Sequence, residues 1–185
     1  MIKFLNTEEL EAGLLEILES PKDEGPLEMI VKRPNVDQRE IIEFGEVTQT
    51  DGLLGDNWKN KGSSKTKDGS ALMDVQLTIM NARCIQLLAQ NKNRWSLAGD
   101  QLYVDMDLSE ENLPIGSKLS IGSSIIEVTA IPHTGCKKFV QRFGKEAVIF
   151  VNSEIGIKNH LRGINAKVLK SGKFKTGDLV KKINP

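Results

Sequence analysis

The sequence has only two cysteines, Cys84 and Cys136, among its 185 residues. That number is too small for a disulfide framework or for a four-thiolate metal site. The two histidines, His133 and His160, do not lie in a zinc-type spacing with a cysteine pair. No apolar run approaches the roughly 20 residues that a membrane-spanning helix needs, and the acidic N-terminus has no signal-peptide core. These absences predict a cytoplasmic protein with free thiols and no membrane partner.

Aromatic residues are also scarce, at 5% of the sequence. Apolar residues at 39% and charged residues at 27% fit a globular chain and exclude overall disorder. At this length we expect a single domain over residues 1–185. The segment 62–70 is rich in glycine, serine and lysine and is too short to separate two domains, so we expect a mobile surface loop there.

Charge is distributed unevenly, although lysines and arginines balance the acids at 25 each. Residues 1–60 carry a net charge of −8, residues 61–130 a net charge of −1, and residues 131–185 a net charge of +9. One interpretation is that the two ends pack together and neutralise each other. The other is that the basic third binds an anion such as a phosphate, a phosphorylated cofactor or a nucleic acid. The sequence alone leaves both open.

The hydrophobic pattern predicts many short strands with glycine turns between them. An amphipathic helix is expected at residues 7–19 with Thr7 as its N-cap, and another from Ala82 to Ala89 with Asn81 as its N-cap. Residues 147–152 are ambiguous between helix and strand. Strands are expected at residues 27–32, 39–44, 71–80, 101–106, 118–121, 124–130, 163–169 and 173–175. This rhythm is typical of a mostly β barrel with a few helices around it.

Cys136 lies in a segment that combines a thiol with several basic residues near an expected helix start. A strand ends at Ile131, a turn follows, and a short helix begins after Cys136 with Lys137, Lys138 and Arg142 close by. A thiol at a helix start beside bases should have more thiolate character, which suits a nucleophile, a sulfur carrier or a metal ligand. Cys84, inside the apolar side of a helix, is expected to be a core residue.

Two further residues have a functional and a structural interpretation. His133 could orient or protonate a substrate, or it could simply cap a strand. Arg162 precedes Gly163 at a strand start, where a guanidinium and backbone amides can hold a phosphate or a carboxylate. A salt-bridging arginine at a strand entry is the alternative.

Several segments of the C-terminal half then form an ordered series. They are Gly99-Asp100-Gln101-Leu102, Leu113-Pro114-Ile115-Gly116, Leu119-Ser120-Ile121-Gly122, Cys136-Lys137-Lys138-Phe139, Arg162-Gly163-Ile164-Asn165-Ala166-Lys167-Val168 and Thr176-Gly177-Asp178. In this order they resemble the MOSC family, named after the C-terminal domain of molybdenum cofactor sulfurase. The resemblance is close over residues 97–181 and looser upstream. It implies a mostly β fold, a MOSC-type β-barrel with a few peripheral helices, preceded by a helix and strands in about residues 1–60.

The resemblance also implies a cofactor, molybdenum bound to molybdopterin. Cys136 would carry sulfur or ligate the molybdenum, with His133 as a second catalytic residue. The cofactor-binding residues implied are Lys137, Lys138, Arg142, Arg162, Gly163, Asn165 and, in place of a His-Gly-Gly segment that many bacterial members carry, Arg83. Pyridoxal phosphate is not expected on this chain, because the sulfurase's desulfurase domain is absent and no lysine can be assigned to a Schiff base.

The expected function is sulfur transfer or a reductive, detoxifying reaction on a small-molecule substrate. A separate reductase or sulfur donor would have to act as partner. A small basic-faced barrel that binds nucleic acid is the first alternative, although the phenylalanines of the basic third look buried. The second is a cysteine hydrolase with Cys136 and His133 or His160, for which no triad signature is present.

Overall fold

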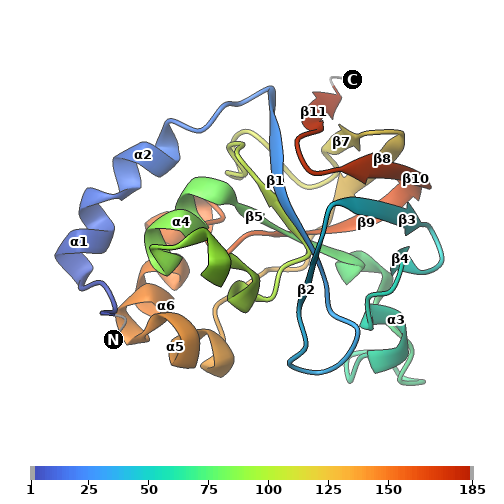
Figure 1. Ribbon diagram of the computed structural model, residues 1–185, viewed down its shortest axis with the longest axis horizontal. Helices are drawn as coiled ribbons and strands as arrows, with labels where there is room; N and C mark the ends of the chain where they lie inside the picture. The colour runs from blue at the N-terminus through green and yellow to red at the C-terminus, as the bar shows by residue number, and fades with distance from the viewer. Residues whose placement is uncertain (1–2, 184–185) are drawn as a thin grey trace.

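A computed structural model describes residues 3–183, and its centre is a closed barrel of seven strands. The strands follow the order β11-β7-β8-β9-β5-β6-β1, and β11 pairs with β1 to close the ring (Figure 1). Neighbouring strands are antiparallel except β5 and β6. The barrel strands are β1 (Glu24–Lys32), β5 (Leu77–Asn81), β6 (Leu102–Val104), β7 (Lys118–Ile121), β8 (Ser124–Val128), β9 (Ile164–Lys170) and β11 (Leu179–Ile183).

Four short strands extend or flank this barrel. A small sheet in the order β10-β3-β4 forms separately, and β2 adds to the edge of β1. They are β2 (Glu40–Ile42), β3 (Phe44–Thr48), β4 (Gly52–Leu53) and β10 (Gly172–Lys175). The barrel encloses one apolar core, in which side chains such as Leu27, Ile79 and Val180 are fully buried. The prediction of a β-barrel with helices around it is confirmed, and helices and strands each hold 29% of the residues.

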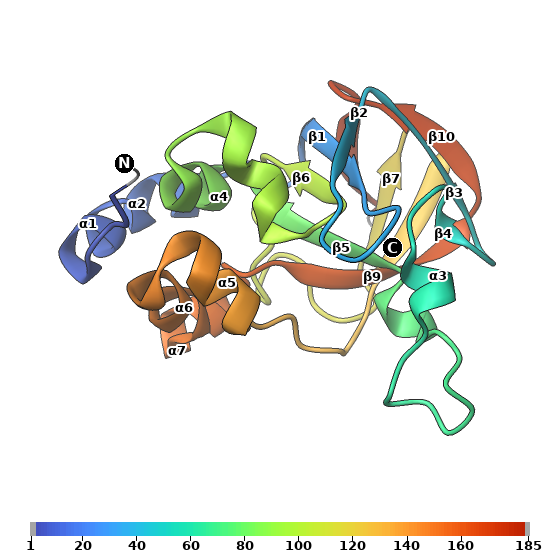
Figure 2. The same ribbon diagram turned by 60° about the horizontal axis from the view of Figure 1, so that its bottom comes forward.

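Most helices gather on one side of the barrel, as Figures 1 and 2 show. They share a second apolar core with the outer faces of β1, β5 and β6, and Tyr103, Phe139 and Phe143 are among its buried members. This group comprises α1 (Thr7–Ala12), α2 (Leu14–Leu18), α4 (Ala82–Ala89), the 3₁₀ helix η2 (Lys92–Ala98), α5 (Lys137–Phe143), α6 (Lys145–Asn152) and α7 (Glu154–Lys158). Helix α3 (Trp58–Lys61) and the 3₁₀ turn η1 (Met73–Val75) lie apart from them.

The expected helix at 7–19 is two helices, which meet at Gly13. A Cβ atom at Gly13 would lie 2.6 Å from the side chain of Leu87 on α4, so the glycine permits a close helix contact. The N-cap is Asn6 and not Thr7, because Asn6 accepts from the Glu9 amide while the Glu9 carboxylate accepts from the Asn6 amide. The prediction of Thr7 as the cap was therefore wrong by one residue.

Other boundaries also differ from the expectation. The strand expected at 71–80 covers only β5, since residues 73–75 form η1, and the strand expected at 39–44 covers β2 and only the first residue of β3. Residues 147–152 are helical within α6. The helix from Ala82 to Ala89 with Asn81 as N-cap is confirmed. The segment 62–70 holds no helix or strand, and no helix within residues 3–183 is long and apolar enough to cross a membrane.

Candidate functional site

A cavity of about 470 Å³ lies where the β1–β2 turn, α3, the end of η2 and the start of α5 meet. Its volume is within the range of ligand-binding pockets. Its apolar wall includes Val36, Trp58, Leu72, Val75 and Phe139. Its basic residues are Arg33, Arg39, Lys61, Lys138, Arg142 and Arg162, and the Cys136 thiol lies at its edge. The cavity thus joins six cationic side chains to one accessible thiol.

Two of the six bases are neutralised by carboxylates from behind the cavity. Asp56 holds Arg33 in a bidentate pair, with Nε–Oδ2 at 2.7 Å and Nη2–Oδ1 at 2.8 Å. Asp100 accepts from Arg162 at 2.7 Å. The side chains of both aspartates have no exposed surface, so these pairs are fixed parts of the cavity wall.

The third carboxylate, Asp37, lies on the cavity side. Its Oδ1 accepts from Lys138 Nζ at 2.7 Å and from Arg142 Nη2 at 3.1 Å. The pKa of Asp37 is lowered, chiefly because Lys138 donates a hydrogen bond to it. Asp37 is more than half exposed, so this contact is open to solvent.

Arg39 and Lys61 are the two bases of the cavity that form no ion pair among residues 3–183. Arg39 Nη1 donates to the carbonyl of Gln38. Its Nε is buried without a hydrogen-bond partner. Burial, Arg142 and Arg33 all lower the pKa of Arg39, but a guanidinium stays protonated in proteins. A charge crowded by like charges in this way favours the binding of an anion.

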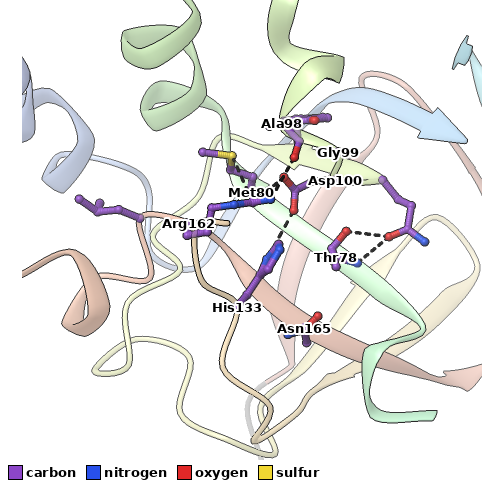
Figure 3. A network of polar contacts seen from close by, with 12 residues as sticks. Thr78, Met80, Ala98, Gly99, Asp100, His133, Arg162 and Asn165 are labelled. Carbon is purple, nitrogen blue, oxygen red and sulfur yellow. Dashed lines mark hydrogen bonds and ion pairs between the residues drawn. The ribbon is translucent and has the colours of Figure 1, made fainter. Parts of the chain in front are cut away.

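Arg162 is held rigidly in the wall (Figure 3). Besides its bond to Asp100, its Nη2 donates to the carbonyl of Ala98 at 3.0 Å, and its guanidinium lies 4.7 Å from the ring centre of Phe139. Its Nε is buried without a partner. Gly163 follows with φ of 108°, and a Cβ there would lie 2.2 Å from the carbonyl of Ile79. The glycine therefore allows the chain to enter β9 against β5 directly after Arg162.

His133 approaches the other oxygen of Asp100, as Figure 3 shows. The distance from Nδ1 to Oδ1 is 3.5 Å, and neither atom has a hydrogen-bond partner among residues 3–183. Burial, and then the Arg162 charge, lower the pKa of His133 to about 3, against the opposing effect of Asp100. The imidazole is therefore neutral at pH 7. His133 adjoins Asp100 behind the wall and is not among the lining residues.

Cys136 is the exposed thiol and Cys84 the buried one. The turn before Cys136 is fixed by Asn152, whose Oδ1 accepts from the Gly135 amide at 2.9 Å. Cys136 is the N-cap residue of α5, but its side chain makes no capping bond. Cys84 donates to the carbonyl of Leu161, and burial raises the pKa of its thiol to about 12. The interpretation of Cys84 as a core residue is confirmed.

The structure brings together only some of the residues predicted for the site. Cys136, Lys138, Arg142 and Arg162 line the cavity. Five predicted residues do not line it, namely Arg83, His133, Lys137, Gly163 and Asn165. Lys137 is exposed and follows Cys136 in the sequence. Arg83 pairs with Asp105 at 2.7 Å, and Asn165 donates to the carbonyl of Ile131. His160 contacts the carbonyl of Leu108 through Nδ1.

Arg33, Arg39, Lys61, Asp37 and Asp100 were missed as site residues. Two of them carried a usable signal, because Arg33 and Arg39 flank a Pro-Asn turn between expected strands, in a segment otherwise rich in acids. A pair of bases in that background stands out. Lys61 and Asp37 had no such local signal, because only the fold brings them into the lining of the same cavity.

No family model matches the sequence, and no curated protein matches it. Solved structures do match this chain. YuaD from Bacillus subtilis has a TM-score of 0.63 at 17% identity, covering 86% of this chain and 95% of that one. YiiM from Escherichia coli has a TM-score of 0.52 at 17% identity, covering 88% and 70%. YiiM from Geobacillus stearothermophilus has a TM-score of 0.52 at 10% identity, covering 89% and 75%.

The fold is MOSC-like. Identities at this level establish the fold alone, and one fold supports many functions.

Proposed function

We propose that the cavity binds a molybdenum–pterin cofactor through its phosphate, with Cys136 as sulfur carrier or metal ligand. The observation that carries this proposal is the convergence of six bases and one exposed thiol on a single cavity. Phosphate groups are bound by clustered guanidinium and ammonium groups. Thiolates are ligands for transition metals that accept soft sulfur donors. The two chemistries that this cofactor requires thus lie side by side.

The residues present fit such a group. Arg39 has no carboxylate partner within the described chain, and the buried Nε atoms of Arg39 and Arg162 lack acceptors. A buried donor without an acceptor is unfavourable, and a bound phosphate or pterin oxygen would satisfy it. The cavity volume of about 470 Å³ suits a cofactor-sized ligand.

The position of each side chain in the cavity indicates its role in binding. Arg39, Lys138 and Arg142 would hold the phosphate, since they reach the cavity from two different elements, the β1–β2 turn and α5. Arg162, fixed by Asp100, would donate from a preset direction. The apolar side chains of Trp58 and Val75 would exclude water from the apolar part of the cavity wall.

When bound, the cofactor would supply a metal able to exchange oxygen or sulfur with a small substrate. The part of this chain is to bind and orient. Cys136 is an exposed residue of the cavity lining and would offer its sulfur to the bound group. The neutral imidazole of His133 keeps a second positive charge away from Asp100, whose carboxylate accepts from Arg162. Both a sulfur transferase and an oxidoreductase are compatible with this arrangement.

The test is to express the chain in a molybdenum-replete host that makes the cofactor, and to quantify bound molybdenum and pterin. The wild type should carry both. Cys136→Ser should lose molybdenum when Cys136 is a metal ligand and keep it when Cys136 only carries sulfur. Arg83→Gln changes a base outside the cavity and should carry as much molybdenum and pterin as the wild type. Absence of both molybdenum and pterin from the wild type, in a host whose own molybdoenzymes are loaded, contradicts the proposal.

A further inference from the structure

Asp37 differs from Asp56 and Asp100, the other two aspartates that pair with bases of the cavity. Asp56 and Asp100 hold their arginines from behind and have no exposed side-chain surface, whereas 56% of the Asp37 side chain is exposed. Asp37 meets Lys138 and Arg142 through a single oxygen, Oδ1. It thus lies on the side from which a ligand must approach these two bases.

The backbone holds Asp37 in an unusual conformation. Residues 35–38 form a turn in which the Gln38 amide donates to the carbonyl of Asn35 at 3.1 Å. Asp37, its third residue, has a φ of 62°, in the left-handed region that favours glycine and asparagine. The turn therefore places a carboxylate among the bases at a position where an uncharged glycine or asparagine would adopt the left-handed backbone at least as well.

Arg142 and Lys138 have no other carboxylate among the described residues. Arg142 Nη1 is already engaged by the carbonyl of Leu97 at 2.7 Å, so its Nη2 is the donor that Asp37 occupies. Arg39 lies close enough for its charge to act on Asp37. One exposed carboxylate thus sits where three cationic side chains converge.

We propose that the Asp37 carboxylate is an internal competitor that occupies the phosphate position and is displaced when a phosphate group binds. The proposal deepens the proposed function and rests on it for the identity of the site. Exposed ion pairs contribute little to stability, so their exchange for a ligand is readily reversible. A phosphate dianion brings twice the charge and three acceptor oxygens, which a carboxylate cannot match.

A consequence is selectivity by charge. A singly charged anion gains no more from Lys138 and Arg142 than Asp37 already provides, so it has little advantage over the internal carboxylate. A dianionic phosphate does have an advantage over the internal carboxylate, because it carries twice the charge. Asp37 would thereby keep chloride and free carboxylates from filling the site.

Isothermal titration calorimetry with inorganic phosphate at low ionic strength tests this proposal. Asp37→Asn removes the charge and suits the left-handed backbone, and it should bind phosphate about tenfold more tightly than the wild type. Asp37→Gly should show a similar gain. Asp51→Asn is the matched control, because Asp51 is an exposed carboxylate paired with Lys59 outside this cavity, and it should leave the affinity unchanged.

Each outcome decides something. Equal or weaker phosphate binding by both folded Asp37 variants overturns the competitor role while leaving the anion site in place. A gain shared by Asp51→Asn reduces the effect to overall charge and also overturns it. If neither the wild type nor either Asp37 variant binds phosphate, the anion site itself fails, and the proposed function fails with it.

Discussion

Arg162 and Asp100, which are 62 residues apart in the sequence, form a buried ion pair with 2.7 Å between Nη1 and Oδ2. The pair connects the entry of β9 to the segment between η2 and β6. It fixes the direction of a guanidinium that lines the cavity. The stability of the barrel and the geometry of the site therefore depend on the same contact.

Asp100→Asn should destabilise the protein by about 3–5 kcal/mol, because it leaves the Arg162 charge buried and uncompensated. Urea unfolding followed by circular dichroism measures the change. The double variant Asp100→Asn with Arg162→Met should recover much of the loss, since it removes both charges and keeps the volume. A loss below about 1 kcal/mol in the single variant would show that water or a neighbour compensates Arg162.

Cys136 should react with iodoacetamide much faster than Cys84 in the native protein at neutral pH. Cys136 is exposed, whereas Cys84 is buried, bonded to Leu161 and has a raised thiol pKa. Peptide mass spectrometry over a time course measures both rates. In urea the two rates should converge, and equal rates in the native state would remove the distinction between the thiols.

The parts of the fold that the sequence predicts well rest on local signals. The cap Asn81 and the helix behind it form as expected, and so does the hairpin of β7 and β8. Gly13 was only a weak local signal for the break between α1 and α2, and the contact of this glycine with Leu87 of α4 could not be read from the sequence. Residues 147–152 are helical because their apolar side chains complete a core shared with distant elements. Tertiary contacts decide what the local pattern leaves open.

The same division applies to the site. Cys136 and the bases after it are neighbours in sequence and could be predicted as a group. Arg33 and Arg39 come from the acidic third and join them only through the fold. The interpretation that the two ends of the chain pack together finds support, since Asp37 and Glu24 of the acidic end pair with Lys138 and Lys181 of the basic end. The interpretation that the basic third binds an anion stays a prediction.

His133 should make the protein less stable in mild acid. Its folded pKa of about 3 lies below the unfolded value of about 6.5, so the unfolded state binds the extra proton between these values. Stability should therefore fall as the pH drops below about 6.5, by up to about 1.4 kcal/mol per pH unit from this group.

Urea unfolding of wild type, His133→Gln and His160→Gln at pH 7 and pH 5 measures this effect. The loss of stability between the two pH values should be smaller in His133→Gln than in the wild type. His160→Gln is the matched histidine change, and a smaller loss in His133→Gln than in His160→Gln assigns the effect to His133. A His133→Gln protein with an unchanged dependence would show that the imidazole is not kept neutral by the fold.

Arg39→Gln should weaken the binding of inorganic phosphate about tenfold, because it removes a partly buried cavity base that has no carboxylate partner within the described chain. The stability of the protein should change little, since no ion pair is broken. The phosphate affinity of the wild type should fall as salt is added, because the site is open to solvent. The salt dependence of phosphate binding should be weaker in Arg39→Gln, since one charge fewer contributes.

Lys59→Gln removes a base that lines a different hollow, and it should alter neither the phosphate affinity nor its salt dependence. If Arg39→Gln binds phosphate as tightly as the wild type, the excess charge of the cavity is not what attracts the anion, and Lys138 and Arg142 must hold it without help from the β1–β2 turn.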